Sequence, residues 1–389
     1  MTVSLQAEIV VVGSGPAGSA TAAALARAGR DVVVLEAAAH PRPKACAEYA
    51  SPRIVEELRA IGLADGDWQP DARAVRGMRV IRGSQGADIS YADGAGPRPA
   101  WGLDRLAFDA TLAQHAVACG ARLRERTSVR RVTVEPSGVE ITTSDDTRIG
   151  ARWVIGADGA RSRVARELGV ERPVRAPRRL GLVAHYEGVE ELSTHGEMHV
   201  GDGIYIGLAP LSDGRLNVGM ALPMDDDRVG AERRFEAAIA SLPAVAERLD
   251  GRRRLTPIRG SAPIGHRVAR SAGAGWMLVG DAAGFVDPFS GEGIFRALRS
   301  ARAAGEALAA GDDGAHERYR VARRRAFAAK DALTWVVQGM LAVPPLLGYA
   351  LSRLDERPEL ARRFGSALGD CRPATDILSP AFLMQVLRP

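Results

Sequence analysis

A glycine-rich turn between an apolar run and an alanine-rich segment constrains this chain most. Residues 13–18 read GSGPAG, directly after the apolar run Ile9–Val12 and before a helical pattern that ends near Gly29. The first glycine of such a turn permits the tight bend, the second lets a phosphate approach the backbone, and the third lets helix and strand pack closely. The pattern predicts a dinucleotide site at a helix N-terminus. Its predicted cofactor-binding residues are Gly13, Gly15, Pro16, Ala17 and Gly18.

An acidic residue ends the next predicted strand. The apolar run Val32–Leu35 is followed by Glu36. A carboxylate at this position can accept hydrogen bonds from both ribose hydroxyls and would repel a 2′-phosphate. We therefore predict that Glu36 binds an adenosine without that phosphate, as in FAD or NAD.

Length and composition restrict the class of protein. With 389 residues, the chain exceeds one compact core, so two interleaved domains are expected. The net charge of +5 is spread without a block of basic residues, which argues against a nucleic-acid partner. Cys46, Cys119 and Cys371 lack the spacing of a metal site or a disulfide framework. The cysteines therefore predict no metal site and fit a reducing compartment. Since the N-terminus shows no secretory signal, we expect a cytoplasmic protein.

The rest of the chain alternates between strand and helix patterns. Ser51-Pro52 looks like a helix N-cap followed by proline, and it predicts a helix that closes near Gly62. Asp104–Gly120 reads as a capped helix. Further buried strands are expected at Arg152–Gly156 and at Trp276–Val279, which returns as a parallel strand. Antiparallel strands are expected over 75–91, 128–142 and most of 179–265, with one helix at about 228–250.

Everything after Gly291 reads as helix. Residues 332–352 carry no charge, but Gly339, Pro344-Pro345 and Gly348 interrupt any membrane-spanning helix there. We interpret this stretch as a helical hairpin that is buried or touches a membrane from one side. Arg323–Arg325, in the arginine-rich segment before it, suit contact with an anionic membrane surface.

Two further motifs follow the glycine turn in sequence. Asp158-Gly159 stands in GADGARSRVAR, and Gly280-Asp281 opens GDAAGFVDPFSGEGI. With the glycine turn, they resemble the three fingerprints of FAD-dependent oxidoreductases related to geranylgeranyl reductases and to p-hydroxybenzoate-hydroxylase-type monooxygenases. DPFSGEGI in particular resembles the geranylgeranyl reductase branch.

The resemblance implies roles for residues outside the turn. Asp281 would accept a ribityl hydroxyl of FAD, Arg105 would face the pyrophosphate, and Asp158 would orient backbone around the nucleotide. The helix that begins at Gly291 would point its N–H groups at the flavin N1–C2=O edge, where reduction places negative charge. The cofactor-binding residues implied in this way are Arg105, Asp158, Gly280, Asp281, Pro288, Gly291 and Gly293.

The expected fold is mixed α/β. It combines a Rossmann-like FAD-binding domain, with the three layers of glutathione reductase, with an inserted antiparallel β-sheet domain for substrate and a helical C-terminus. We assign 1–74, 100–178 and 266–310 to the FAD-binding domain, 75–99 and 179–265 to the substrate-binding domain, and 311–389 to the helical region.

The loop PKACAEYASP (residues 43–52) matches a Lys-x-Cys-Gly segment that lines the flavin in that branch, through Lys44 and Cys46. Ala47 replaces the usual glycine, so the loop has less access to positive φ. Tyr205 begins a stretch in which Gly207 and Ala209 replace the two aromatic residues of the family's Tyr-x-Trp-x-Phe-Pro element. The substitutions predict a wider pocket.

Reduction of a C=C bond by flavin requires a hydride at one carbon and a proton at the other. The predicted proton donors or positioning groups are Cys46, Glu48, Tyr49 and Tyr205, and Lys44 would favour the thiolate form of Cys46. The expected substrate is a large apolar molecule such as an isoprenoid lipid, with NADH or NADPH as reductant. The alternatives are a flavin monooxygenase that hydroxylates a phenolic or polyketide substrate and, as a different class, a flavin- or NAD-dependent sensor.

Overall fold

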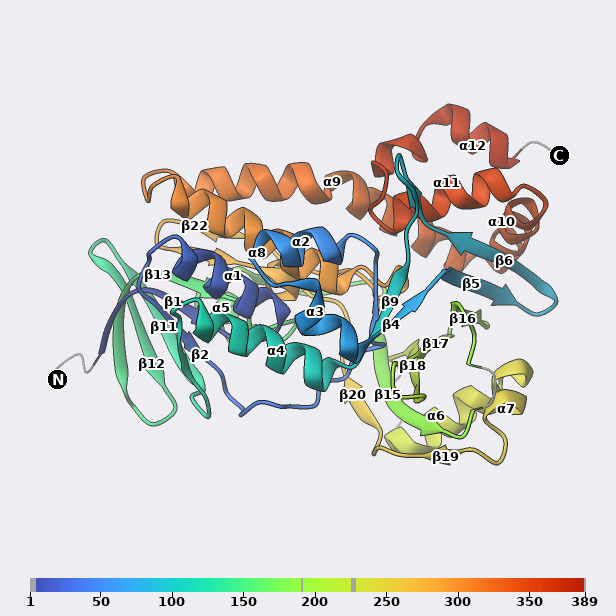
Figure 1. Cartoon of the computed structure of the whole chain (residues 1–389), viewed down its shortest axis with the longest axis horizontal. Helices are drawn as coiled ribbons and strands as arrows, with labels where there is room; N and C mark the ends of the chain where they lie inside the picture. The colour runs from blue at the N-terminus through green and yellow to red at the C-terminus, as the bar shows by residue number, and fades with distance from the viewer. Residues whose placement is uncertain (1–4, 190–191, 225–228, 388–389) are drawn as a thin grey trace.

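A computed structural model describes residues 5–189, 192–224 and 229–387, and a mainly parallel sheet forms its first unit (Figure 1). Its strand order is β10-β2-β1-β13-β12-β11, with β23 beside β13 and β22 beside β23. The parallel strands are β10 (Arg122–Arg124), β2 (Val32–Leu35), β1 (Leu5–Val12), β13 (Arg148–Gly156) and β23 (Trp276–Leu278). The antiparallel strands are β11 (Val129–Glu135), β12 (Gly138–Thr143) and β22 (Ala272–Gly273).

Both faces of β1 are buried, which explains its unbroken apolar run. Ile9 and Val11 pack in one core with α1 (Pro16–Arg27), α4 (Arg105–Ala118) and α8 (Gly293–Ala309). Val10 and Val12 pack in another core with β11, β12 and α5 (Arg163–Glu167). The helices, the parallel strands and the β11–β12 hairpin are the three layers expected of a Rossmann-type FAD domain.

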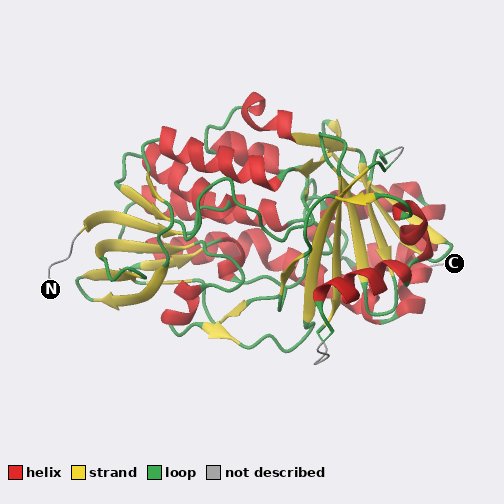
Figure 2. Cartoon of the chain, turned by 90° about the horizontal axis from the view of Figure 1, so that it is seen from below, coloured by secondary structure: helices red, strands yellow, loops and turns green. Residues whose placement is uncertain are grey.

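A second sheet has the order β19-β15-β18-β17-β16-β5-β6, with β20 beside β15. All its pairings are antiparallel except β16 with β5, which is parallel and was not expected. Its strands are β5 (Gly77–Arg82), β6 (Gln85–Ser90), β15 (Arg179–Glu187), β16 (Gly196–Val200), β17 (Tyr205–Pro210), β18 (Leu216–Pro223), β19 (Arg253–Arg254) and β20 (Arg259–Ser261). Figure 2 shows strands of the two sheets toward opposite ends of the long axis, with helices between them.

Two helices cover the outer face of the second sheet, where the sequence predicted one. They are α6 (Ala231–Ala240) and α7 (Pro243–Leu249). The break falls before Pro243, because proline starts a new helix more readily than it continues one. Phe235 and Val245 pack against the apolar side chains of β17 and β18.

The helix after the 43–52 loop begins later than predicted. It is α2 (Ile54–Ala60), with Arg53 at its N-cap. The predicted cap, Ser51, instead directs its hydroxyl to Asp370, at 3.3 Å. A contact with the C-terminal part of the chain therefore replaces the local cap, and the prediction of the helix start at Ser51-Pro52 is wrong.

The C-terminal region is helical, as expected, but its arginine-rich and charge-free segments share one helix. This is α9 (Ala315–Ala342), which runs along one edge of the molecule in Figure 1. It is followed by α10 (Pro344–Glu356), α11 (Pro358–Leu368) and α12 (Pro380–Leu387), and α10 and α11 pack on β6. Within the described residues, no single helix is long and apolar enough to span a membrane, although α9 and α10 together, bent by 112°, meet that criterion.

Short elements complete the fold. A small sheet consists of β3 (Tyr49–Ala50), which lies within the 43–52 loop, β9 (Ala100–Leu103) and β4 (Ala72–Val75). The remaining elements are α3 (Asp65–Trp68), β7 (Ala92–Asp93), β8 (Gly96–Pro97), β14 (Glu171–Arg172) and β21 (Arg267–Val268). The domain limits given above stay a prediction.

Candidate active site

The glycine turn is crowded at its first and third glycines and open at its second. Gly13 has φ +96°, and a Cβ there would lie 2.7 Å from the carbonyl oxygen of Ala157. A Cβ on Gly18 would lie 1.8 Å from the Gly13 carbonyl oxygen. At Gly15 the nearest atom to a Cβ would be Nη2 of Arg42, at 3.5 Å. The turn therefore packs through two glycines and leaves the backbone of the other accessible, which a pyrophosphate on the helix N-terminus requires.

Glu36 lies beside this turn, directly after β2. Its Oε2 accepts hydrogen bonds from the backbone N–H and the hydroxyl of Ser14, both at 2.9 Å, and Oε1 accepts one from Ala38 N–H at 3.1 Å. Burial raises the pKa of Glu36, but the Ser14 N–H and the Arg42 guanidinium outweigh burial, and the net pKa lies below its usual value. The carboxylate is thus ionised next to the turn, where a ribose would bind.

Arg42 is a residue that the sequence reasoning missed. Its Nε lies 3.2 Å from Oε1 of Glu36 in an ion pair, is buried, and has no hydrogen-bond partner. A buried guanidinium nitrogen without a hydrogen bond, in a side chain that reaches over Gly15, fits an anionic phosphate. The signal that points to it is its position in the Pro-Arg-Pro stretch shortly after the ribose-binding acid. The glycine turn, Glu36 and Arg42 together fit the ADP half of FAD.

Asp158 follows β13 and caps the next helix. Its carboxylate accepts hydrogen bonds from the Ser162 hydroxyl (2.6 Å) and from the N–H groups of Arg163 (2.6 Å) and Val164 (3.1 Å). Burial raises the pKa of Asp158 in spite of these donors. This side chain fixes the turn so that Gly159 lies in the wall of the cavity described below. Its role toward the nucleotide stays a prediction.

Asp281 lies just beyond β23, in the wall of the same cavity. Within the described part of the chain, its carboxylate makes no hydrogen bond or ion pair, so it is available to a ribityl hydroxyl. Gly291 has φ +68° and forms a turn by donating its N–H to Pro288 at 3.0 Å, and α8 begins at Gly293. A Cβ on Gly293 would meet no atom within 4 Å. The N-terminus of α8 is therefore open toward the cavity, as the flavin N1–C2=O edge needs.

The cavity has a volume of about 580 Å³ and lies between the two units. This is a volume typical of cofactor and ligand sites. It is lined by all five predicted catalytic residues, which are Lys44, Cys46, Glu48, Tyr49 and Tyr205. The predicted cofactor residues in its wall are Gly15, Pro16, Ala17, Arg105, Asp158, Asp281, Pro288, Gly291 and Gly293. Gly13, Gly18, Glu36 and Gly280 lie outside the wall, and Gly280 packs against Ala17 of α1.

Arg105 is the cation that contacts Cys46. Its Nη1 donates to Sγ of Cys46 at 3.1 Å, while Nε and Nη2 bind the carboxylate of Asp109 at 2.7 and 2.8 Å. Lys44 is exposed, and its Nζ lies 3.8 Å from the position of a Cβ on Gly159. Among the described residues, no hydrogen bond joins Lys44 to Cys46. The expected lysine–thiol pair is therefore replaced by an arginine–sulfur contact, and the contact of Arg105 with pyrophosphate stays a prediction.

Glu48 is buried in the cavity wall and has a positive φ, one residue after Ala47, which stands in place of the family's usual glycine. Its φ is +57°, whereas Ala47 is not left-handed. Its Oε2 lies 2.7 Å from Nε2 of His185 and accepts a 2.7 Å hydrogen bond from Nδ2 of Asn217. His185 on β15 and Asn217 on β18 were not predicted, since no local pattern marks a contact between segments so far apart in the chain.

The two tyrosines are tied to other polar groups. The Tyr49 hydroxyl pairs with that of Tyr91 at 2.8 Å, and the Tyr205 hydroxyl donates to Oδ1 of Asp287 at 2.8 Å. Arg179 forms an ion pair with the other oxygen of Asp287. Burial raises the pKa of Tyr49 and of Tyr205 well above the usual value. Neither hydroxyl is a strong acid, and both fit a positioning role better than proton donation.

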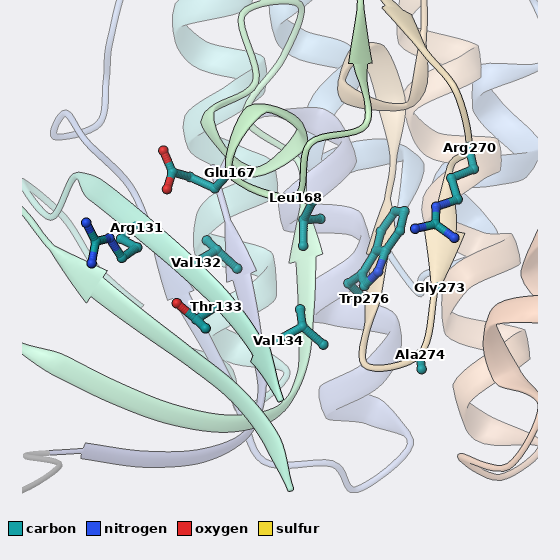
Figure 3. A pocket seen from close by; sticks show the side chains of 10 residues that line it. All are labelled: Arg131, Val132, Thr133, Val134, Glu167, Leu168, Arg270, Gly273, Ala274 and Trp276. Carbon is teal, nitrogen blue, oxygen red and sulfur yellow. The ribbon is translucent and has the colours of Figure 1, made fainter. Parts of the chain in front are cut away.

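A second groove, of about 720 Å³, lies away from these residues (Figure 3). Trp276 and Arg270 line one side, and Val132 of β11 and Leu168 line the other. Trp276 begins β23, whereas Asp281 follows its end, so the groove lies at the opposite end of that strand from the cavity. None of the predicted site residues lines it.

Dinucleotide-binding geometry, an available acid beyond β23 and an open helix N-terminus define a flavoprotein oxidoreductase site. Comparison with known proteins agrees with this class. Residues 6–330 match the family model described as FAD binding domain. A menaquinone reductase of Mycobacterium tuberculosis is 35% identical over 326 residues, covering 79% of this chain and 78% of that protein. A digeranylgeranylglycerophospholipid reductase of Methanopyrus kandleri is 32% identical over 316 residues, covering 78% and 80%.

The fold also occurs in a flavin-dependent brominase, with a TM-score of 0.82 at 21% identity, over 96% of this chain and 97% of that one. At this identity the likeness shows the fold alone. The chain belongs to the FAD-dependent oxidoreductases with this FAD-binding domain, and among them to the geranylgeranyl reductase family.

Proposed function

We propose that this chain uses FAD to reduce a C=C bond of an isoprenoid-type lipid. The observation that carries the proposal is a part of the wall of the same cavity formed by the second sheet. Gly207 on β17 and Gly219 on β18 form a cross-strand pair, and a Cβ on Gly207 would meet nothing closer than 3.5 Å. Apolar side chains surround this glycine floor, namely Met78, Val183, Met198, Met220, Ile264 and Phe289.

The names of the curated relatives support the same class of substrate. The two relatives described above are named for the reduction of menaquinone and of digeranylgeranylglycerophospholipid, and both molecules carry isoprenoid chains. An apolar alkene offers no oxygen for an oxyanion hole, so catalysis depends on placing the bond against the hydride donor and a proton donor. An apolar floor built on Gly207 and Gly219, in which a Cβ on Gly219 would lie 3.0 Å from the Cβ of Ala47, suits that task.

Bound FAD would supply the hydride chemistry. The chain's own residues hold the cofactor through the glycine turn, Glu36, Arg42 and Asp281, and we propose that this binding is non-covalent. We further propose that NADH or NADPH reduces the flavin. Anaerobic mixing of the yellow FAD-loaded protein with each nicotinamide tests this, because the flavin absorbance is lost only with a competent reductant.

The function is tested with a menaquinone that carries a two-prenyl side chain. With FAD and the competent reductant, and after the quinone head group has been reoxidised in air, we expect a menaquinone whose side chain has gained two hydrogens, about 2 mass units. A matched variant that narrows the floor, Gly207→Trp, should lose conversion while its FAD content stays unchanged. A protein that binds no FAD, or one that binds FAD and leaves isoprenoid chains unreduced, would contradict the proposal.

We also propose that the C-terminal helices touch a membrane from one side. Five large apolar residues on α9, on α10 and between them are 39–51% exposed: Trp335, Val336, Val343, Leu346 and Tyr349. On the buried side of α9, Leu333 and Val337 pack in the same core as Tyr205 of the cavity. The apolar core under α9 therefore joins this surface to the site, as a lipid substrate would need.

Flotation of the protein with anionic vesicles tests the membrane contact. The double change Trp335→Asp and Leu346→Asp should abolish flotation. The change Val117→Asp, at an exposed residue of α4, should leave it intact.

A further inference from the structure

A hydrogen-bonded network joins the cavity wall to the second sheet through Glu48. The side chain of Glu48 is 5% exposed. Its Oε2 is bound by His185 and Asn217, as described above, and its Oε1 accepts the N–H of Arg105 at 3.2 Å. Donors from three elements hold this one carboxyl group. Glu48 also has a φ of +57°, and such backbone strain in a non-glycine residue is retained mostly where it serves a site.

His185 lies behind Glu48, on the path to the outside. Its side chain is 14% exposed and does not line the cavity. Its Nδ1 lies 3.3 Å from Oγ1 of Thr256, a half-buried hydroxyl. The order Thr256, His185, Glu48 therefore leads from a partly solvated group to the cavity wall. An imidazole with one nitrogen on each side can accept a proton at one and release it at the other.

Cys46 is placed differently from Glu48. Its sulfur accepts hydrogen bonds from the Arg105 guanidinium, at 3.1 Å, and from the Glu48 N–H, at 3.4 Å. The sulfur is thus bound by Arg105 and by the Glu48 backbone, and in the described residues no histidine lies behind it as His185 does behind Glu48. Tyr49 and Tyr205 are bound to their own partners. Four carboxyl groups lie in the cavity wall, those of Glu48, Asp158, Glu197 and Asp281, and Glu48 is the one whose backbone binds Cys46 and whose carboxyl group contacts His185.

We propose that Glu48 gives the proton to the substrate and that His185 returns a proton to Glu48 from solvent. This inference rests on the proposed function. The hydride from reduced flavin forms one C–H bond, and the π electron pair of the alkene takes the proton of the Glu48 carboxyl group to form the other. The carboxylate left behind takes the Nε2 proton of His185, and water replaces it at the Nδ1 side. Glu48 is then a catalytic residue, His185 the relay, and Asn217 a positioning residue.

The kinetic test is a single turnover. FAD-loaded protein is reduced with dithionite, freed of the excess and mixed anaerobically with the two-prenyl menaquinol. Because the head group of the menaquinol is already reduced, flavin reoxidation, followed by absorbance, reports reduction of the C=C bond. Loss of a general acid typically lowers a rate by about 10²-fold or more, so we expect that loss for Glu48→Gln and a smaller one for His185→Ala. Imidazole in the buffer should restore several-fold of the His185→Ala rate. His199→Gln is the matched control, because His199 pairs with Glu197 at 3.0 Å in the same sheet.

A second readout needs neither turnover nor cofactor. In protein with ¹⁵N-labelled histidine, the Nε2 resonance of His185 should shift in Glu48→Gln, while that of His199 should not. The affinities for FAD and for the menaquinone should match wild type in both variants. A His185→Ala protein that turns over at the wild-type rate, or that imidazole fails to rescue, overturns the relay. Failure of wild type itself to reduce the menaquinone overturns the proposed function, and the inference with it.

Discussion

Cys46 illustrates how a residue's neighbours decide its chemistry. The sequence pairs it with Lys44, two positions away, but the fold brings Arg105 to the sulfur and leaves Lys44 exposed. Arg105 is anchored by Asp109 on the same helix, which holds the guanidinium at a fixed position. Removal of the sulfur should therefore disturb the order of the loop next to the flavin without removing the FAD-binding residues.

We predict that Cys46→Ala retains FAD and loses about tenfold or more of its turnover, because Glu48 loses the N–H···S contact that fixes its backbone. Steady-state rates together with FAD content check this. Cys119→Ala is the control, since Cys119 is also a half-buried free thiol but lies outside the cavity. Turnover at the wild-type level in Cys46→Ala would show that the thiol only fills space.

Individual residues were predictable where their role is local. Glu36 and Asp281 each follow a buried strand, and position in the strand–turn pattern is enough to identify them. The partners of Glu48 were not predictable, because His185 and Asn217 come from strands more than 100 residues away and have no distinctive spacing. Arg42 was partly predictable, because its two proline neighbours indicate a fixed loop conformation close to Glu36, although no periodic pattern points to its role.

At the scale of elements, the β1–α1 turn separates packing from binding. A Cβ on Gly18 would collide with the Gly13 carbonyl, whereas one on Gly15, which has φ −70°, would meet only the end of Arg42. The same turn thus contains a position that stability needs and another that the cofactor needs.

We predict opposite effects from two alanine substitutions in this turn. Gly18→Ala should lower the free energy of unfolding of the apoprotein by about 2 kcal/mol, the usual range for overpacking. Gly15→Ala should leave that stability within about 0.5 kcal/mol, because the φ of −70° suits alanine and the added Cβ would meet only the end of Arg42. The same change should weaken FAD binding. Urea unfolding of apoprotein and FAD titration measure the two quantities. Equal effects of both changes on both quantities would contradict this division.

Element boundaries were least predictable where distant segments meet. The start of α2 moved from Ser51 to Arg53 because Ser51 binds Asp370, and the parallel pairing of β16 with β5 joins segments from different parts of the chain. By contrast, α4 has its predicted cap, with Asp104 accepting the N–H of Leu106 at 2.9 Å. Local capping signals hold when no tertiary contact competes with them.

For the whole molecule, a buried charge cluster joins the C-terminal helices to the flavin-binding segment. Lys330 of α9 lies 2.9 Å from Glu292, at the start of α8, and 3.1 Å from Asp370 after α11. Arg296 also pairs with Glu292, at 3.3 Å. One buried lysine thus serves two carboxyl groups, and it is one of only two lysines in the chain.

Burial raises the pKa of Asp370 to about 6, from a usual value of 3.8. The folded state therefore binds this proton more tightly than the unfolded chain, so its contribution to stability is full below pH 3.8 and is lost as pH rises through about 6. We predict that the stability of wild type relative to Asp370→Asn falls over this range and then levels off. Urea unfolding at several pH values checks this, with the surface change Asp376→Asn as control. A constant difference between wild type and Asp370→Asn would contradict it.

The whole fold does not by itself choose the chemistry. A fold of this kind also occurs in a protein named as a flavin-dependent brominase, so the same scaffold is found with a different reaction name. The residues of the cavity distinguish the two reactions. Its wall combines the glycine floor and apolar side chains with Glu48, whose network supplies protons in our proposal. These features favour reduction over oxygen insertion.

The most direct measurement is the mass of the product from paired reactions with and without oxygen. FAD-loaded protein, the competent nicotinamide and the two-prenyl menaquinone are incubated under argon and under air. After the quinone head group has been reoxidised in both samples, the account predicts the same product, with a side chain heavier by two hydrogens, about 2 mass units. A product that forms only under air and is heavier by one oxygen, about 16 mass units, would contradict it.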